Sequence, residues 1–373
     1  MNSIYINSIK QISAQQPLVD DWFENPILYN EQYVRALEPD YKQFFTPNES
    51  RRLGKILKRA LLVSRQAMSE SGVALPDAII TGTGLGCIEN TEIFLDKLVR
   101  EGEELLNPTH FMQSTHNTIG SLIAIDAKCN AYNTTYAHKG ISFECALQDA
   151  FMQMKSGKIK TALVGAHDEM TPAYFTLLKK ADYLGNPNQT FAGETAVAMM
   201  LSTEKTEKTM CEIGAVEKVY TGVRGVRGVK ELGGVMELEG GMERGNIDYI
   251  MVGTNGNPEN DKIYFENCAE MFPNVPLLQY KNIFGEGYTM PALGVYAAAV
   301  CLQKGEIPDF LMCDMQQSQI PNPKSQIPNL KSQIPNPKSQ ISNPKSQISN
   351  LKSKILCYNH FEGKNHTFVL LSN

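Results

Sequence analysis

Apolar residues recur every three or four positions between Ser50 and Met68, which is the spacing of one face of an α-helix. A capping box precedes this segment, because Thr46 is followed three residues later by Glu49, with a proline at the first helical position. Gly72 is a residue at which such a helix ends. The pattern therefore predicts one long helix over residues 50–68.

Short apolar runs alternate with helical patterns in the residues that follow. The runs predict strands at residues 78–81, 132–136 and 161–165, and the helical patterns predict helices at residues 90–100, 117–128 and 142–156. Alternation of this kind is typical of layered α/β proteins. We therefore predict an α/β fold.

Two glycine-containing segments, residues 82–94 and 253–264, resemble each other. Each follows an apolar strand pattern and leads into a helical one. The similarity indicates an internal duplication, and chance similarity over so short a stretch is the alternative.

A repeat with a period of seven residues fills residues 317–355, with units such as Lys-Ser-Gln-Ile-Pro-Asn-Leu. The period is that of a coiled coil, but the prolines exclude a continuous helix. One isoleucine per unit buries too little apolar surface to offset the entropy lost on ordering. We predict an exposed, disordered insertion that arose by repeat expansion, and a binding tether is the alternative.

Composition is that of a globular protein, with 42% hydrophobic and 20% charged residues among 373. No stretch reaches the roughly 18 to 20 uncharged apolar residues of a membrane span, and no signal pattern opens the chain, so we expect a cytoplasmic protein without a membrane partner. The net charge of −5 argues against a nucleic-acid partner. Eight cysteines without metal-ligand spacing predict free thiols, no metal site and no cofactor.

Several blocks of the sequence follow one another as they do in β-ketoacyl synthases. The blocks are residues 78–87, 111–125, 142–150, 157–169, 192–202, 252–256 and 281–294. The chain resembles this family over most of its length, and the resemblance implies a thiolase-like fold of two similar halves in α-β-α-β-α layers. We place the halves at residues 1–205 and 206–373, with the repeat inserted in the second.

The resemblance also implies a site of one cysteine and two histidines, and the chain departs from the family at all three positions. Gly140 stands in place of the nucleophile, and Asn255 and Glu286 stand in place of the histidines. Glycine cannot carry an acyl group, and an ionised glutamate would repel the enolate that the family's histidines stabilise. We predict that none of the three is catalytic. We expect Lys281 to form an ion pair with Glu286 or Glu169.

Two side chains near Gly140 are alternative nucleophiles. Ser142 needs a base and occupies a position typical of a helix cap. Cys145 lies one turn inside the predicted helix, away from the terminal N–H groups that would stabilise its thiolate. We interpret both as structural, and an active acyltransferase with a rearranged site is the alternative. Residues 358–365 resemble a shortened form of the family's glycine-rich gating loop.

The cysteine-less pattern is similar to that of chain-length-factor-like subunits, and residues 114–120 together with the cysteine-free residues 140–144 resemble the synthase-like proteins of aryl-polyene and flexirubin-type pathways. The resemblance implies a heterodimer with an active ketosynthase, or a homodimer, and an acyl carrier protein as a further partner. It also implies that residues 111–125 contribute to the dimer contact, so Ile119, Leu122 and Ile123 are predicted to face the partner. A solitary thiolase-fold binding protein is the third possibility.

Overall fold

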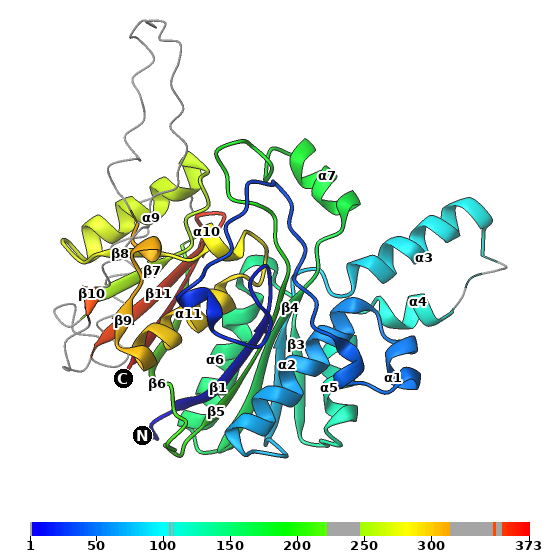
Figure 1. The fold of residues 1–373 in the computed structure, drawn as a ribbon, viewed down its shortest axis with the longest axis horizontal. Helices are drawn as coiled ribbons and strands as arrows, with labels where there is room; N and C mark the ends of the chain where they lie inside the picture. Colours follow the sequence, from blue (N-terminus) through cyan, green and yellow to red (C-terminus); the bar gives the residue numbers. More distant parts are fainter. Residues whose placement is uncertain (1, 104–105, 107, 222–246, 314–345, 348–352) are drawn as a thin grey trace, which may run out of the picture.

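The fold is described by a computed structural model (Figure 1), which covers residues 2–103, 106, 108–221, 247–313, 346–347 and 353–373. The strands of the first half are β1 (Tyr5–Ile12), β2 (Ala78–Gly82), β3 (Tyr132–Tyr136), β4 (Thr161–Asp168) and β5 (Thr195–Ser202). Those of the second half are β6 (Cys211–Tyr220), β7 (Tyr249–Val252), β8 (Leu277–Gln279), β11 (Lys354–Phe361) and β12 (Asn365–Ser372). They form one sheet in the order β3-β2-β4-β5-β1-β6-β12-β11-β7-β8.

The two halves of the sheet repeat one strand order, which is β3-β2-β4-β5-β1 in the first half and β8-β7-β11-β12-β6 in the second. In the first half β2 is parallel to its neighbours β3 and β4, and β5 is antiparallel to its neighbours β4 and β1. In the second half β7 is likewise parallel to β8 and β11, and β12 is antiparallel to β11 and β6. The similar segments 82–94 and 253–264 follow the equivalent strands β2 and β7. The duplicated fold is therefore confirmed, while the exact boundary at residue 205, between β5 and β6, stays a prediction.

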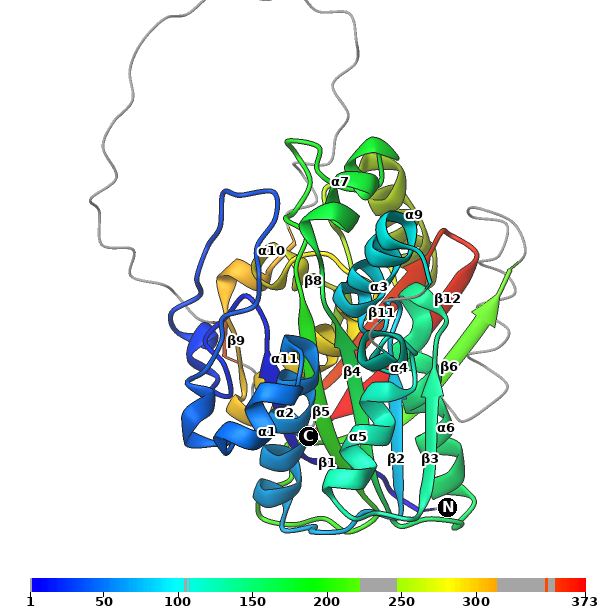
Figure 2. The same ribbon diagram turned by 90° about the vertical axis from the view of Figure 1, so that its right-hand side faces the viewer.

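Helices cover both outer faces of the sheet and fill the space between its halves (Figures 1 and 2). Two helices, α2 (Lys55–Ser71) and α5 (Thr118–Asp126), pack on the first half of the sheet. Helix α9 (Pro258–Met271) packs on the second half. The central layer consists of α6 (Ser142–Lys155) and α11 (Pro291–Lys304). The α-β-α-β-α layering is thus confirmed. Among the described helices, none has the length and apolar character needed to cross a bilayer.

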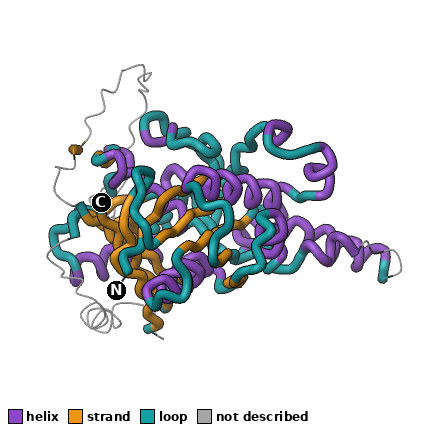
Figure 3. The backbone as a smooth tube through the Cα atoms, turned by 90° about the horizontal axis from the view of Figure 1, so that it is seen from below, coloured by secondary structure: helices purple, strands orange, loops and turns teal. Residues whose placement is uncertain are grey.

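The remaining helices are short or peripheral. They are α1 (Pro47–Arg52), α3 (Ile88–Glu101), α4 (Pro108–Gln113), α7 (Pro172–Lys180) and α10 (Lys281–Phe284). Figures 1 and 3 show α3 and α4 projecting from the body of the molecule as an arm.

The single helix predicted over residues 50–68 is two helices in the structure. The capping box of Thr46 and Glu49 forms as predicted, but it opens only the short α1. Leu53 and Gly54 then adopt extended backbone, with ψ of 127° and 166°, before α2 begins. Leu53 packs against the core of the first half, so its burial outweighs the helical spacing. Gly72 ends α2 with φ of 77°, as predicted.

Most of the seven-residue repeat lies outside the described residues, and its two described parts are ordered. Ser346 and Gln347 form β10, which is antiparallel to β9 (Glu306–Ile307). Ser353 is buried and Ile355 is 0% exposed at the start of β11. The disordered interval predicted at residues 317–355 was therefore wrong at its C-terminal end, because the last unit continues into a core strand that buries its isoleucine.

Candidate functional site

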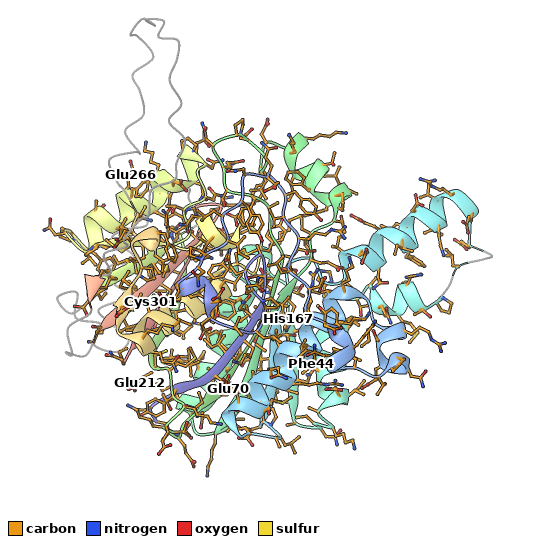
Figure 4. All side chains as sticks on the ribbon, viewed as in Figure 1. Phe44, Glu70, His167, Glu212, Glu266 and Cys301 are labelled. Atoms are coloured by element: carbon orange, nitrogen blue, oxygen red, sulfur yellow. The ribbon has the colours of Figure 1, made fainter. Side chains whose placement is uncertain are left out.

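One cavity of 510 Å³ brings the three substituted positions together. Gly140 reaches it from the turn directly before α6, Asn255 from the loop after β7, and Glu286 from the loop after α10. The turn between β11 and β12, one face of α9, residues 181–183 and Tyr288 also line it, and Glu266, labelled in Figure 4, lies on the α9 side. Three segments far apart in sequence thus form one site.

The ring of Phe361 occupies the space where a nucleophilic side chain would project from position 140. A Cβ atom built on Gly140 would lie 2.3 Å from Phe361 Cδ2 and 2.9 Å from its Cγ. Real Cβ atoms do not approach other atoms so closely, so only glycine fits here while the ring stays in place. A side chain at position 140 therefore has no room while the Phe361 ring keeps this position.

A tight hairpin turn holds Phe361 in this position. Phe361 ends β11 opposite Asn365 of β12, and the intervening Glu362 and Gly363 have φ of 55° and 63°. Asn359, two residues earlier, donates from Nδ2 to the carbonyl oxygen of Gly140 at 3.1 Å. The predicted shortened loop is thus a hairpin anchored to the turn that it covers.

Glu286 is buried and bound on both carboxylate oxygens. Its Oε2 accepts from Lys281 Nζ at 2.8 Å and from Asn255 Nδ2 at 2.7 Å, and its Oε1 accepts from the N–H of Gly287 at 2.9 Å. Glu286 is thus the partner of Lys281, because Glu169 instead accepts from the N–H of Glu89 at 2.9 Å. Lys281 and Glu286 thus form a buried ion pair that Asn255 joins through a hydrogen bond.

The loop that carries Asn255 is rigidly held by its own hydrogen bonds. Asn255 Oδ1 accepts from the N–H of Asn257 at 3.1 Å and from Asn260 Nδ2 at 3.3 Å. Asp261, in the first turn of α9, accepts the N–H groups of Asn255 and Gly256 at 2.9 Å each. Asn255 is therefore a structural linker between Glu286 and α9, and the described residues contain no group of three side chains suited to hold a metal.

Ser142 is fully buried and its hydroxyl is committed to the preceding turn. It donates to the carbonyl oxygen of Lys139 and accepts from the N–H of His138, both at 2.8 Å. The expected helix cap is not formed by its side chain, because Ile141 is the N-cap residue of α6. The hydroxyl instead fixes the turn that contains Gly140.

Cys145 has two polar neighbours that the sequence did not reveal together. Its Sγ accepts from Lys218 Nζ at 3.2 Å and lies 3.9 Å from His138 Nδ1. Cys145 is 2% exposed, and burial raises its pKa against the opposing effect of the Lys218 ammonium. The thiol form is therefore favoured. Lys218 lies on β6, and no local pattern connects it with α6.

The residues predicted to face a partner point largely into the chain's own core. Ile119 and Ile123 are 1% and 2% exposed and pack with α2, while Leu122 is half-buried against the same cluster. Asp126 bonds to Arg65 of α2. The prediction was wrong for Ile119 and Ile123, because α5 is apolar on several faces and its spacing does not say which face turns inward, whereas for the partly exposed Leu122 it stays a prediction.

Exposed apolar side chains occur on both helices of the arm, at the end of α5 and on β3. They are Leu95 and Val99 of α3, Phe111 and Met112 of α4, Ile125 of α5 and Tyr132 of β3. In the described part of the sheet, β3 is an end strand that pairs only with β2. An unpaired strand edge flanked by exposed apolar residues is a surface suited to protein contact.

Glu144 is a buried acid behind the site that sequence reasoning missed. Its Oε1 accepts from Asn359 Nδ2 at 2.7 Å and from Thr367 Oγ1 at 2.9 Å. Burial raises the pKa of Glu144 to about 7. A charged residue in the apolar first turn of α6 was the available signal, because such a residue requires partners when buried.

Comparison with known proteins agrees with this architecture. A family model described as "Beta-ketoacyl synthase, N-terminal domain" matches residues 22–224. The solved "ishigamide ketosynthase/chain length factor" superposes with a TM-score of 0.77 at 15% identity, covering 100% of this chain and 99% of that one. The ketosynthase ApeO in complex with its chain length factor ApeC, from Xenorhabdus doucetiae, gives 0.76 at 14% identity, with 100% and 98% covered.

A β-ketoacyl synthase from Burkholderia phymatum gives a TM-score of 0.73 at 12% identity, with 100% of both chains covered. No curated protein matched the sequence. At these identities the superpositions establish the fold, which extends over the whole of each compared chain.

Proposed function

This chain belongs to the β-ketoacyl synthase family, and we propose that within the family it is a non-catalytic subunit that pairs with an active, cysteine-containing synthase. The observation that carries the proposal is the Phe361 ring in the space that a side chain at Gly140 would need. A ketosynthase reaction passes through an acyl group held on the enzyme. A site that cannot hold that group cannot complete the reaction.

The polar half of the site supports the same proposal. Lys281 and Asn255 both donate to Glu286, so the two charges are paired within the protein and the Asn255 amide is engaged with the carboxylate. Decarboxylative chemistry requires donors that are aimed at a developing enolate oxygen. A carboxylate at that position opposes the negative charge that would develop.

The exposed apolar residues of the chain offer a surface to which a partner synthase could bind. We place the contact on the arm of α3 and α4 and on the free edge of β3, which carry exposed apolar residues. Two of the superposed structures are described as a ketosynthase with its chain length factor. We further propose that the pair takes acyl carrier protein substrates in fatty-acid or polyketide-type synthesis and that this subunit shapes the pocket for the growing chain.

The finer assignment to aryl-polyene or flexirubin-type pathways rests on the sequences of residues 114–120 and 140–144. Residues 114–120 end in the first turns of α5, directly after the arm. The first of the two segments whose sequence suggests the pathway therefore lies beside the proposed contact surface.

A second candidate function is acyl transfer through Cys145, favoured by the Lys218 ammonium 3.2 Å from its sulfur. The raised pKa of this buried thiol opposes it. A third is a solitary thiolase-fold binding protein, which would use the arm for self-association.

One experiment separates the three functions. The chain is co-expressed with a cysteine-containing synthase from neighbouring genes, and both the complex and the isolated chain are incubated with acyl and malonyl carrier thioesters. We expect co-purification in equal amounts, product only from the complex, and an unmodified mass for this chain. An acyl adduct on Cys145 would favour the second function, and self-association without synthase binding would favour the third.

A further inference from the structure

A second, water-sized cavity lies behind the degenerate site, between α6, α11 and the second half of the sheet. Its volume is 10 Å³, and its polar lining residues include Glu144, Tyr280, Asn359 and Thr367. A single water molecule requires a space of about 10 to 15 Å³ on this measure and two to four polar partners. The cavity meets the lower limit of that volume.

Two residues that line this cavity each carry a buried polar atom without a protein partner. These atoms are Glu144 Oε2 and the hydroxyl oxygen of Tyr280, and neither forms a hydrogen bond within the described residues. The two side chains are 3% and 2% exposed. Leaving buried polar atoms unbonded is costly, and both atoms belong to residues that line the same small space.

Glu144 also connects this cavity to Phe361, whose ring fills the space beside Gly140 and is called the plug below. Its other oxygen binds Asn359 Nδ2 at 2.7 Å, and the same nitrogen donates to the carbonyl oxygen of Gly140 at 3.1 Å. Alternate residues of a strand share a face, so Asn359 and Phe361 lie on one side of β11. The orientation of Glu144 therefore bears on the position of the plug.

We propose that this cavity binds one water molecule that bridges Glu144 Oε2 and the Tyr280 hydroxyl. The water completes the bonding of the carboxyl group, which then presents its other oxygen to Asn359. Asn359 in turn ties the hairpin to Gly140 and keeps Phe361 over the nucleophile's position. Glu144, Tyr280 and the water act as a positioning unit, and this role holds whether or not the chain pairs with a synthase.

A high-resolution crystal structure of the full chain tests the site directly. We expect a density peak within hydrogen-bonding distance of Glu144 Oε2 and the Tyr280 hydroxyl. An unoccupied cavity would overturn the proposal.

The variant Tyr280→Phe gives an independent test, because the two outcomes have opposite signs. If water bridges the two groups, loss of the hydroxyl removes a hydrogen bond and lowers the melting temperature. If the cavity is dry, the substitution removes an unsatisfied hydroxyl, and the melting temperature stays the same or rises. Tyr358→Phe is the matched control, since the Tyr358 hydroxyl has partners in Asn267 and His366 and its loss is destabilising in either case.

Hydrogen exchange tests the positioning role. We expect faster exchange of the amides of residues 359–363 in Tyr280→Phe and in Glu144→Leu, with near-normal rates in Glu144→Gln, whose amide retains an acceptor oxygen. Exchange in β1, which is distant from the hairpin in the sheet order, should not change. A bound water with unchanged hairpin exchange in both variants would disprove the positioning role.

Discussion

Under the proposed function, the contact between Gly140 and Phe361 means that position 140 has neither a nucleophilic side chain nor the space for one. A single substitution at position 140 restores only the first, because the ring remains 2.3 Å from the new Cβ. The surrounding carboxyl groups add a second constraint, since Glu144 and Glu286 are both buried and each depends on named hydrogen-bond donors.

Gly140→Cys should therefore destabilise the chain and remain unacylated by carrier thioesters. Overpacking of this kind costs about 1 to 3 kcal/mol. In Gly140→Cys/Phe361→Ala the ring is gone, so the double variant should be less destabilised than the sum of the single variants. Denaturant unfolding of the four proteins measures this coupling, and strict additivity would contradict the proposed plug.

Glu144→Gln should change how stability depends on pH. Burial raises the folded-state pKa of Glu144 to about 7, whereas an exposed glutamate titrates near about 4.3. Between these values the unfolded chain releases the proton and the folded chain keeps it, so the unfolding free energy falls as pH rises and levels off above the folded pKa. Glutamine has no such titration.

Relative to the original protein, Glu144→Gln should therefore gain stability from acidic pH up to about pH 7, by roughly 1.4 kcal/mol for each unit of pKa shift. Urea unfolding at several pH values measures the difference. Burial also raises the pKa of Glu169 to about 7, but this residue is present in both proteins and cancels in the comparison. A difference that does not vary with pH would contradict the assignment.

At the level of elements, α5 and the arm have different roles although both are apolar. Helix α5 turns Ile119 and Ile123 into the first core, while α3 and α4 leave Val99 and Met112 84% and 69% exposed. Ring contact between Phe94 and Phe111, with centroids 5.3 Å apart, joins the two arm helices. The arm is thus an ordered element with an uncovered apolar face.

Val99→Asp or Met112→Asp should abolish co-purification with the partner synthase while leaving the melting temperature of this chain nearly unchanged. A charge placed in an apolar interface is buried without a partner, whereas at an exposed position it costs the free chain little. Leu28→Asp is the control, because Leu28 is 72% exposed and belongs neither to the arm nor to β3. Ile119→Asp should instead destabilise the isolated chain. If both arm variants still co-purify with the synthase, the interface lies elsewhere on the chain.

Replacement of residues 317–345 by a short Gly-Ser linker, which keeps β10, should leave the melting temperature within a few degrees, because the length of a connection changes closure entropy only slowly. Replacement of residues 317–355 should be strongly destabilising, since it also removes Ile355, which is 0% exposed in β11. Thermal unfolding of the two variants makes the comparison. Equal stability would show that the start of β11 is dispensable.

At the scale of the whole molecule, the two halves share one interior. Among the described strands, those of the two halves pair with each other through β1 and β6 alone, at Tyr5–Glu212 and Ile6–Cys211. The central helices α6 and α11, however, belong to a single core cluster that also contains Ile4 of the first half and Val369 of the second. The halves are distinct in topology and joined in their packing.

The chain should accordingly unfold in one cooperative transition, and residues 1–205 expressed alone should not form a stable domain. Removing the second half would expose the inner face of α6, where Phe143, Ala146 and Leu147 are each 0% exposed. Differential scanning calorimetry of the full chain and solubility of the fragment test this expectation. Two resolved transitions would instead support independent halves.

Much of the fold followed from local pattern. The strand predicted at residues 132–136 coincides with β3, and the helix predicted at 142–156 differs from α6 by one residue. Spacing and turn residues act over a few positions, which explains this agreement. The same locality explains the errors, because the break at Leu53 and the inward face of α5 depend on contacts with residues far along the chain.

The sequence by itself determined the layered, duplicated architecture and the absence of cysteine and histidine at Gly140, Asn255 and Glu286, because these depend on residue identity and on local order. Only the tertiary structure decided that Phe361 fills the nucleophile's space, that Lys281 pairs with Glu286, and that the arm carries the exposed apolar face. These contacts join segments whose distance in space no local spacing specifies, so packing alone selects them.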